Sequence, residues 1–239
     1  MRPDDGVIAQ LALLDSCSLA DAIDVTRAGY VTSELHPMWE GARLAGRAVT
    51  VRLEPVPAAG AGSTVHLGVA AIEMSWPGDV IVIANEGRTE MGGWGGLLSF
   101  AAAQRQVSGV VLDGACRDVD EARELAFPVI ARAAVARTAR GRVYQADCGE
   151  PVTVTGTVVA PGDLVFADAS GTVFLPAAAA TDVIAEATRI VRREQGMQAR
   201  LRAGEPLSNV LGADYESMLE ERRNLRSGVD RGPVRPLNA

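Results

Sequence analysis

Residues 92–118 read GGWGGLLSFAAAQRQVSGVVLDGACRD, and this stretch decides the fold. It follows VIVIA (Val80–Ala84), a short run of β-branched residues that is typical of a buried strand. Gly92-Gly93 and Gly95-Gly96 predict a loop after this strand. The Ala- and Leu-rich segment Leu97–Arg105 then predicts a helix because it contains no glycine. Gly109–Leu112 predicts a second buried strand, which the next two residues, Asp-Gly, would end. We therefore expect a strand–helix–strand unit with two parallel strands and a right-handed crossover.

The ends of this unit predict a binding site. The helix start and the carboxyl ends of both strands should share one sheet edge, where open α/β sheets bind ligands. Arg117 and Asp118 follow the second strand and would face the free amides of Gly95–Leu98. A helix start attracts anions, arginine binds carboxylates through two parallel hydrogen bonds, and aspartate binds hard cations. The pattern predicts a pocket for a small carboxylate and a divalent metal.

The same pair of residues has a simpler interpretation. An Arg-Asp pair after a strand is by itself more often a salt bridge in a loop than a site. The glycine-rich helix start opposite Arg117 and Asp118 makes a binding site about as well supported as a structural salt bridge.

The chain contains no HExxH motif and no Cys/His cluster, so a bound metal would depend on carboxylates and water. This favours Mg²⁺ or Mn²⁺. Such an ion beside an arginine that binds a carboxylate suits a 2-oxo acid, because the ion polarises the ketone and stabilises an enolate. Carbon–carbon cleavage or decarboxylation next to the keto group is the reaction class that follows.

The composition excludes several other classes of protein. The 239 residues are 48% apolar and 22% charged, as in ordinary globular domains. A net charge of −7 and an aromatic content of 4% argue against nucleic-acid binding. The three cysteines show no CxxC spacing, so we predict neither a disulfide framework nor zinc. An acidic start (MRPDDG) and the lack of about 20 consecutive apolar residues predict a cytoplasmic protein without a membrane partner.

The N-terminal part predicts a helix and then a strand. The helix would have Ser18 as its N-cap and Gly29 as its stop. Asp21 and Asp24 lie three positions apart on it, and we interpret them as solvent-facing carboxylates rather than metal ligands. Ala45–Leu53 alternates in the way a strand does.

A glycine-rich turn, AAGAGS (residues 58–63), precedes a predicted helix for which Ser63 would be the N-cap. The turn lacks both the full GxGxxG pattern and a Walker-type lysine, so a plain strand–helix connection is favoured over a cofactor loop. His66 is favoured as a packing or edge histidine over a catalytic one. Neither of the two histidines has triad spacing to a serine or cysteine, so we do not predict a hydrolase triad.

Residues 1–178 form the predicted α/β core, and residues 179–239 a helical extension with a polar tail. The extension has an apolar stripe, with Thr181 or Asp182 as its cap and an interruption at Gly196. A helix that leaves the core usually packs on a neighbour, so we predict an oligomerisation element. The end of the tail is predicted to be disordered.

The stretch from residue 92 to 118, with the FPV of ELAFPVIAR, resembles the RraA-like proteins. The resemblance runs from about Leu19 to Glu205 and includes LADAID, PGDVIVIA, the GxxRD element and PGDLVFADASG. This family includes the 4-hydroxy-4-methyl-2-oxoglutarate / 4-carboxy-4-hydroxy-2-oxoadipate aldolases and the regulator of ribonuclease E activity. The resemblance implies a β/β/α swivelling-domain core that assembles as trimers or hexamers with sites between subunits.

The resemblance also assigns roles to residues. It implies that Asp118 holds the metal and that Arg117 binds the substrate. The backbone that cradles the pyruvoyl group would be that of Gly95, Gly96 and Leu97, and Leu98 belongs to the same helix start. Glu194 matches a C-terminal glutamate that reaches the metal water of a neighbouring subunit. Many members carry an acidic or amide residue where this chain has Gly96, and the preceding loop, EGRTEMGG, also differs.

Two functions of different classes follow. The first is a class II aldolase that uses Mg²⁺ or Mn²⁺, releases pyruvate from a 4-hydroxy-2-oxo acid and also decarboxylates oxaloacetate. The second is a non-catalytic regulator that binds a ribonuclease. Retention of both Arg117 and Asp118 favours the enzyme. A menaquinone methyltransferase is not predicted, because AAGAGS matches an S-adenosylmethionine loop poorly and no acidic ribose ligand follows it.

Overall fold

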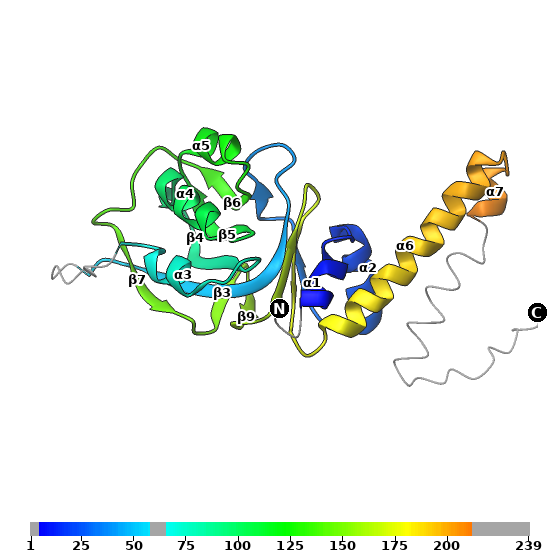
Figure 1. Ribbon diagram of the computed structural model, residues 1–239, viewed down its shortest axis with the longest axis horizontal. Helices are drawn as coiled ribbons and strands as arrows, with labels where there is room; N and C mark the ends of the chain where they lie inside the picture. Colours follow the sequence, from blue (N-terminus) through cyan, green and yellow to red (C-terminus); the bar gives the residue numbers. More distant parts are fainter. Residues whose placement is uncertain (1–4, 58–65, 212–239) are drawn as a thin grey trace, which may run out of the picture.

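The computed structural model describes residues 5–57 and 66–211 (Figure 1). The predicted turn at 58–63, with its cap Ser63, and the predicted disordered end of the tail lie outside these ranges. The helices are α1 (Asp5–Leu11), α2 (Ser16–Thr26), α3 (Val69–Met74), α4 (Gly96–Gln104), α5 (Val119–Glu124), α6 (Ala180–Arg202) and α7 (Leu207–Val210). The strands are β1 (Tyr30–Thr32), β2 (His36–Pro37), β3 (Leu44–Pro55), β4 (Val80–Trp94), β5 (Gly109–Cys116), β6 (Val129–Ala134), β7 (Val143–Cys148), β8 (Val152–Val154), β9 (Thr157–Val159), β10 (Leu164–Ala167) and β11 (Thr172–Leu175).

Nine strands form one mixed sheet in the order β1-β11-β10-β3-β4-β5-β6-β2, and β7 also pairs with β3. Strands β3, β4, β5 and β6 pair in parallel, whereas the remaining pairs of this sheet are antiparallel. A separate hairpin consists of β8 and β9. Helix α4 connects the parallel strands β4 and β5, which confirms the predicted strand–helix–strand unit.

Strand β4 is longer than predicted and includes glycines that we expected in a loop. Gly92 and Gly93 belong to β4, whose register against β5 shifts three times. A Cβ at Gly114 of β5 would lie 2.8 Å from the carbonyl oxygen of Arg88, so the glycine allows the bulged β4 to approach closely. Strand β5 also continues past its predicted end to Cys116. The loop prediction was wrong because these glycines permit close packing of strands rather than a turn.

The predicted ends of α2 were shifted by a few residues. Asp15, not Ser18, is the N-cap, and Ser18 completes a capping box by bonding back to Asp15. The helix ends at Thr26, and its C-cap, Arg27, adopts a left-handed backbone two residues before the predicted stop at Gly29. The sequence pattern therefore located this helix but not its capping residues.

Helix α6 is continuous and begins just before the predicted caps Thr181 and Asp182. The predicted interruption at Gly196 was wrong. A Cβ at this position would meet nothing within 4 Å, so the glycine lies on an open side of the helix. There it costs about 1 kcal/mol relative to alanine, which is too little to break a helix whose first half is packed.

Three apolar clusters surround the sheet. One cluster joins one sheet face to α3, α4 and α5, and a second packs the other face against the β8–β9 hairpin. The third joins α1, α2 and the first half of α6 to strands β10 and β11. The second half of α6 extends beyond this cluster (Figure 1). Within the described ranges, no single helix has the length and apolar character to cross a bilayer; α1 and α2 meet that test only as a pair bent by 112°.

Candidate functional site

Arg117 and Asp118 lie where β5 passes into α5, close to the start of α4 (Figure 1). The backbone N–H of Arg117 donates to the carbonyl oxygen of Trp94, the last residue of β4, at 2.9 Å. Asp118 precedes α5 with a left-handed backbone (φ 57°), a conformation that aspartate tolerates better than most residues. This turn carries the chain from β5 into α5 and brings the side chain of Asp118 against α4.

Two donors fix the carboxylate of Asp118. Its Oδ2 accepts a hydrogen bond from the backbone N–H of Gly96, the first residue of α4, at 3.0 Å. The Nε of Arg117 lies 3.2 Å from both carboxylate oxygens. A negative charge at this helix start is favoured by the helix dipole. The side chains of Arg117 and Asp118 are still 37% and 29% exposed, so a ligand can reach them.

Several donors in this region are not used by the protein itself. Arg117 pairs with Asp118 only through Nε, and no acceptor in residues 5–57 or 66–211 bonds its terminal nitrogens Nη1 and Nη2. The backbone N–H groups of Leu97 and Leu98 lie in the first turn of α4, where N–H groups have no hydrogen-bond acceptor within the helix. Together these groups can bind a carboxylate.

Glycines provide the space for this arrangement. A Cβ at Gly92 would lie 3.0 Å from Cγ of Arg117, and one at Gly95 would lie 2.8 Å from Oδ2 of Asp118. Neither glycine has a positive φ, so the requirement is for space rather than backbone freedom. These positions therefore determine where the two charged side chains sit.

Gly96 is the position where many relatives were expected to carry an acidic or amide side chain. In this chain a Cβ at Gly96 would overlap a carboxylate oxygen of Glu121. Glu121 lies on α5, one turn after Asp118, and its side chain is exposed. A carboxylate thus occupies the space of the missing side chain, although it comes from another helix.

The buried side chain of Trp94 holds the start of α4 in place. Its side chain is 1% exposed, and its Nε1 donates to Oγ of Ser99 at 2.9 Å. The ring stacks on Phe127 with centroids 6.3 Å apart. Ser99 Oγ in turn donates to the carbonyl oxygen of Gly95 at 3.2 Å. Sequence patterns do not predict this role for Trp94, because its stacking partner Phe127 comes from a separate segment of the chain.

A cavity of about 380 Å³ opens beside the Arg-Asp pair. The predicted residues that line it are Gly95, Gly96, Leu97, Leu98, Arg117 and Asp118. The wall also includes His66, Thr138, Arg140 and Tyr144, which the sequence analysis did not assign to the site. His66, interpreted from sequence as a packing or edge residue, is exposed, and its Nδ1 lies 3.0 Å from the carbonyl oxygen of Leu67.

Glu194 is the one predicted site residue that does not join the others. It lies on the outer half of α6, at the opposite end of the molecule from α4 and α5 (Figure 1).

Asp21 and Asp24 are exposed on α2, as predicted for solvent-facing carboxylates. Partial burial and the neighbouring Asp24 raise the pKa of Asp21, and Arg193 opposes this shift. Neither aspartate approaches the cavity.

The donor set at the cavity fits a hard, hydrated cation. Asp118 is its lining carboxylate, and the described residues contain no group of three His, Cys, Asp or Glu side chains that could hold a metal. Mg²⁺ keeps several waters and binds through one or two carboxylates, whereas zinc needs three or four protein ligands.

Burial raises the pKa of the nearby Cys116 thiol to about 11, a backbone hydrogen bond opposes the shift, and Asp118 adds to it. The thiol therefore stays protonated at neutral pH.

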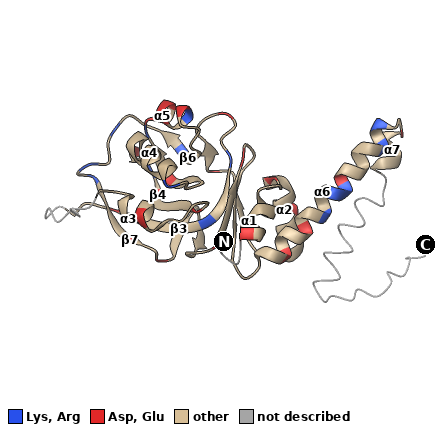
Figure 2. Ribbon diagram, in the orientation of Figure 1, with Lys and Arg blue, Asp and Glu red and all other residues tan. Residues whose placement is uncertain are grey.

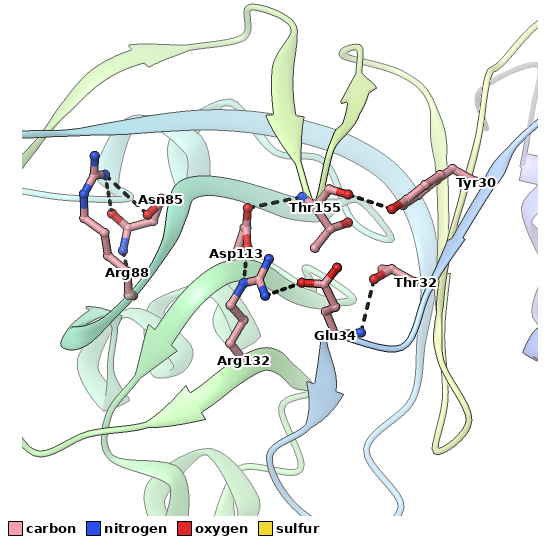
Figure 3. Close-up of polar contacts among 8 residues, drawn as sticks. All are labelled: Tyr30, Thr32, Glu34, Asn85, Arg88, Asp113, Arg132 and Thr155. Atoms are coloured by element: carbon pink, nitrogen blue, oxygen red, sulfur yellow. Dashed lines mark hydrogen bonds and ion pairs between the residues drawn. The ribbon is translucent and has the colours of Figure 1, made fainter.

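A second group of charged residues lies on the hairpin side of the sheet (Figure 3). Arg132 pairs with Asp113 and Glu34, and Oδ2 of Asp113 accepts from the backbone N–H of Thr155 at 3.2 Å. Burial lowers the pKa of Arg132, but the hydrogen bonds to Asp113 and Glu34 raise it by more. Because its charges are paired and tie the hairpin to β5, we interpret this group as structural.

Comparison with known proteins identifies the family. The sequence profile of the RraA-like proteins, described as Aldolase/RraA, matches residues 16–174. The chain belongs to the RraA-like family. Protein DlpA of Legionella pneumophila is 27% identical over 201 residues, which are 84% of this RraA-like chain and 32% of DlpA. The chain thus spans about a third of DlpA.

A protein of Halalkalibacterium halodurans named "Putative 4-hydroxy-4-methyl-2-oxoglutarate aldolase" is 29% identical over 201 residues, 82% of this chain and 87% of that protein. Among solved structures, an uncharacterized protein from Pseudomonas syringae has a TM-score of 0.78 and 27% identity, covering 86% of this chain and 92% of that one. Streptomyces coelicolor RraAS2 has a TM-score of 0.73 and 25% identity, covering 83% and 98%. These likenesses confirm the predicted RraA-like α/β fold.

Gly92 tests whether the position of Arg117 controls anion binding. We expect Gly92→Ala to press on the stem of Arg117 and weaken calorimetrically measured binding of oxalate with Mg²⁺ about tenfold, or roughly 1.4 kcal/mol. Gly93→Ala is the matched control, because its Cβ would meet the core residues Leu53 and Leu112 instead. The control should lower the melting temperature and leave oxalate binding intact. Unchanged oxalate binding by Gly92→Ala would show that Arg117 does not depend on this glycine.

Proposed function

We propose that the protein is a divalent-metal-dependent lyase that cleaves a 4-hydroxy-2-oxo acid and releases pyruvate, with decarboxylation of oxaloacetate as a second activity. The observation that carries this proposal is the pairing of Arg117 with Asp118 against the N-terminus of α4, at the wall of a cavity. Membership of a family described as Aldolase/RraA, and a relative with an aldolase name, support it.

The proposed role of Arg117 is to bind the carboxylate of the 2-oxo acid. Its Nη1 and Nη2 atoms can form two parallel hydrogen bonds to one carboxylate. The amides of Leu97 and Leu98 would add donors that need no reorganisation, because α4 holds them in place. The Nε of Arg117 stays on Asp118, so one guanidinium would orient the substrate and the metal ligand together.

The proposed role of Asp118 is to hold Mg²⁺ or Mn²⁺. When bound, such an ion polarises the 2-oxo group and stabilises the negative charge that forms on its oxygen during cleavage. The N–H of Gly96 keeps Oδ2 in a fixed direction, and Oδ1, which accepts only from Nε of Arg117 among the described residues, would have a lone pair left for the ion.

We further propose that the protein works as a trimer or hexamer in which Glu194 of one subunit reaches the site of the next. The outer half of α6 extends beyond the core and carries several arginines (Figure 2). On α4, Leu97 and Phe100 are 79% and 50% exposed, and they border a hollow shared with Glu121 and Glu124. Opposite charges and exposed apolar side chains suit an interface between copies.

The proposed setting is the cytoplasm, with a small 2-oxo acid and copies of the chain as partners. The net charge of −7 gives little attraction for nucleic acid or for anionic membranes. The three cysteines are free, as is usual in a reducing compartment.

A second candidate function is regulation of a ribonuclease by direct binding. Streptomyces coelicolor RraAS2 is described as an unusual member of an RNase ES inhibitor family. The exposed Leu97 and Phe100 give this chain an apolar surface that a protein partner could cover. Release of pyruvate separates the two candidates, because a regulator needs no turnover.

The enzyme proposal predicts dependence on a hard metal ion. In a coupled assay of pyruvate release, turnover of a 4-hydroxy-2-oxo acid should require Mg²⁺ or Mn²⁺ and disappear with EDTA. Asp118→Asn should abolish it, because an amide is a poorer ligand for a hard cation. Asp120→Asn is the matched control, since Asp120 is exposed on α5 and, among the residues that the structure describes, pairs only with Arg123. Full turnover in EDTA would refute the metal-dependent mechanism.

The assembly proposal predicts complementation between inactive variants. Light scattering should give a trimer or larger, and truncation at Ala180 should reduce both assembly and activity. Asp118→Asn and Glu194→Gln should each be nearly inactive alone. Oligomers mixed from the two should regain part of the activity, because some interfaces then combine both native residues. A monomer in solution, or a fully active Glu194→Gln enzyme, would exclude a shared site.

A further inference from the structure

We propose that His66 is the acid–base residue of this site, and that its Nε2 carries the proton that the reaction moves. This inference rests on the proposed function, because it assigns a further residue to the same cavity. His66 lines the cavity together with Arg117 and Asp118, but it comes from the segment that leads into α3. Its side chain is exposed, so a ligand in the cavity can reach it.

One hydrogen bond fixes the tautomer of the His66 ring. Its Nδ1 lies 3.0 Å from the carbonyl oxygen of Leu67. A carbonyl oxygen only accepts hydrogen bonds, so in the neutral ring Nδ1 carries the proton and Nε2 keeps a lone pair. Among the residues that the structure describes, none forms a hydrogen bond with Nε2. The ring therefore offers the cavity a nitrogen that can take up a proton.

The backbone that bears His66 is anchored to the residue that holds α4. The N–H of Val69 lies 3.3 Å from the carbonyl oxygen of His66, and the N–H of Gly68 donates to Oε1 of Gln145 at 3.0 Å. Gly68 has a φ of +77°, and a Cβ there would lie 3.0 Å from the ring of Trp94. Because Trp94 also bonds to α4 through its Nε1, one buried ring positions both the histidine segment and the start of α4.

The other titratable side chains of the described cavity wall are poorly suited to accept this proton. Arginine does not give up its own proton in proteins, so neither Arg117 nor Arg140 can act as a base. The carboxylate of Asp118 accepts from two donors and is the proposed metal ligand. The hydroxyl of Tyr144 already donates to a carboxylate on β3 at 3.0 Å. This leaves His66 as the group that can both take up and release a proton.

The proposed proton transfer accounts for every atom of the cleavage. Nε2 takes the proton of the 4-hydroxyl while the C3–C4 bond of the substrate breaks. The hydroxyl oxygen becomes the carbonyl oxygen of the departing product, and the electron pair of the broken bond forms the enolate of pyruvate. The imidazolium then returns the proton to C3, which gives pyruvate and restores the neutral ring. Imidazole suits both steps, because it exchanges a proton near neutral pH.

Decarboxylation of oxaloacetate has a different requirement. The carboxylate that leaves as CO₂ carries no proton, so this bond breaks without a base. Only the final protonation of C3 remains, and water can also supply that proton. Loss of His66 should therefore slow the cleavage of a hydroxy acid much more than it slows decarboxylation.

Exchange of the methyl hydrogens of pyruvate with D₂O, followed by NMR with Mg²⁺ present, measures this proton transfer without a second product. We expect the wild-type protein to catalyse exchange and His66→Gln to do so at least a hundredfold more slowly, a typical effect of losing a general base. His36→Gln is the matched control, because it removes the other histidine of the chain, which is exposed on β2. The control should exchange at the wild-type rate.

Two further measurements separate proton transfer from a structural role of His66. Calorimetric binding of oxalate with Mg²⁺ should stay within about threefold of wild type in His66→Gln, because oxalate binding moves no proton. Added imidazole should restore part of the exchange in His66→Ala. No exchange by the wild type, equal exchange by His66→Gln, or loss of oxalate binding without rescue by imidazole would overturn the assignment.

Pyruvate release from 4-hydroxy-2-oxoglutarate and from oxaloacetate is followed in parallel. His66→Gln should lose at least a hundredfold in the first reaction and less than tenfold in the second. If the wild type cleaves neither compound but its exchange depends on His66, the lyase proposal fails and the acid–base role stands. If His66→Gln cleaves the hydroxy acid at the wild-type rate, the lyase proposal stands and the role of His66 is overturned.

Discussion

The arrangement of the site depends on one hydrogen bond, from the backbone N–H of Gly96 to Oδ2 of Asp118. It joins the start of α4 to the chain that leaves β5, and it leaves Arg117 alongside the same carboxylate. Without it, the two charged residues would form an ordinary surface ion pair, which contributes little and has no fixed geometry. With it, they form an oriented pair at the wall of a cavity, next to amides that have no partner in their own helix.

This hydrogen bond is possible because of how β4 and β5 are built. The two strands run parallel, so the end of each lies at the edge where α4 begins and α5 follows. The glycines at 92 and 95 then allow the side chains of Arg117 and Asp118 to lie against the end of β4. The buried Trp94 supports α4 through Ser99, so the amide of Gly96 cannot easily move away. The same core packing that holds α4 in place therefore also fixes the position of the site.

The sequence predicted the parts that depend on local patterns. β-branched runs and an Ala/Leu segment located β4, α4 and β5, and the order of these elements placed Arg117 and Asp118 at one sheet edge. Glycines misled the prediction in two ways: Gly92 allows close contact with Arg117 rather than a turn, and Gly196 lies on an open side of a helix that continues through it. Arg140 was missed because its connection reaches the site through long-range contacts that leave no local pattern. The role proposed for Glu194 would require a second copy of the chain, because within one chain Glu194 lies on the outer half of α6, away from the cavity.

In the proposed mechanism, Asp118, held by α4, binds a metal ion next to an arginine that binds carboxylates. Titration of Mn²⁺ followed by electron paramagnetic resonance tests it most directly, because the free ion and the bound ion give different signals. We expect one bound Mn²⁺ per chain, loss of that binding in Asp118→Asn, and a change in the bound signal when oxalate is added to the wild type but not to Arg117→Ala. Mn²⁺ that remains free in the wild type, or that binds Asp118→Asn equally well, would contradict it.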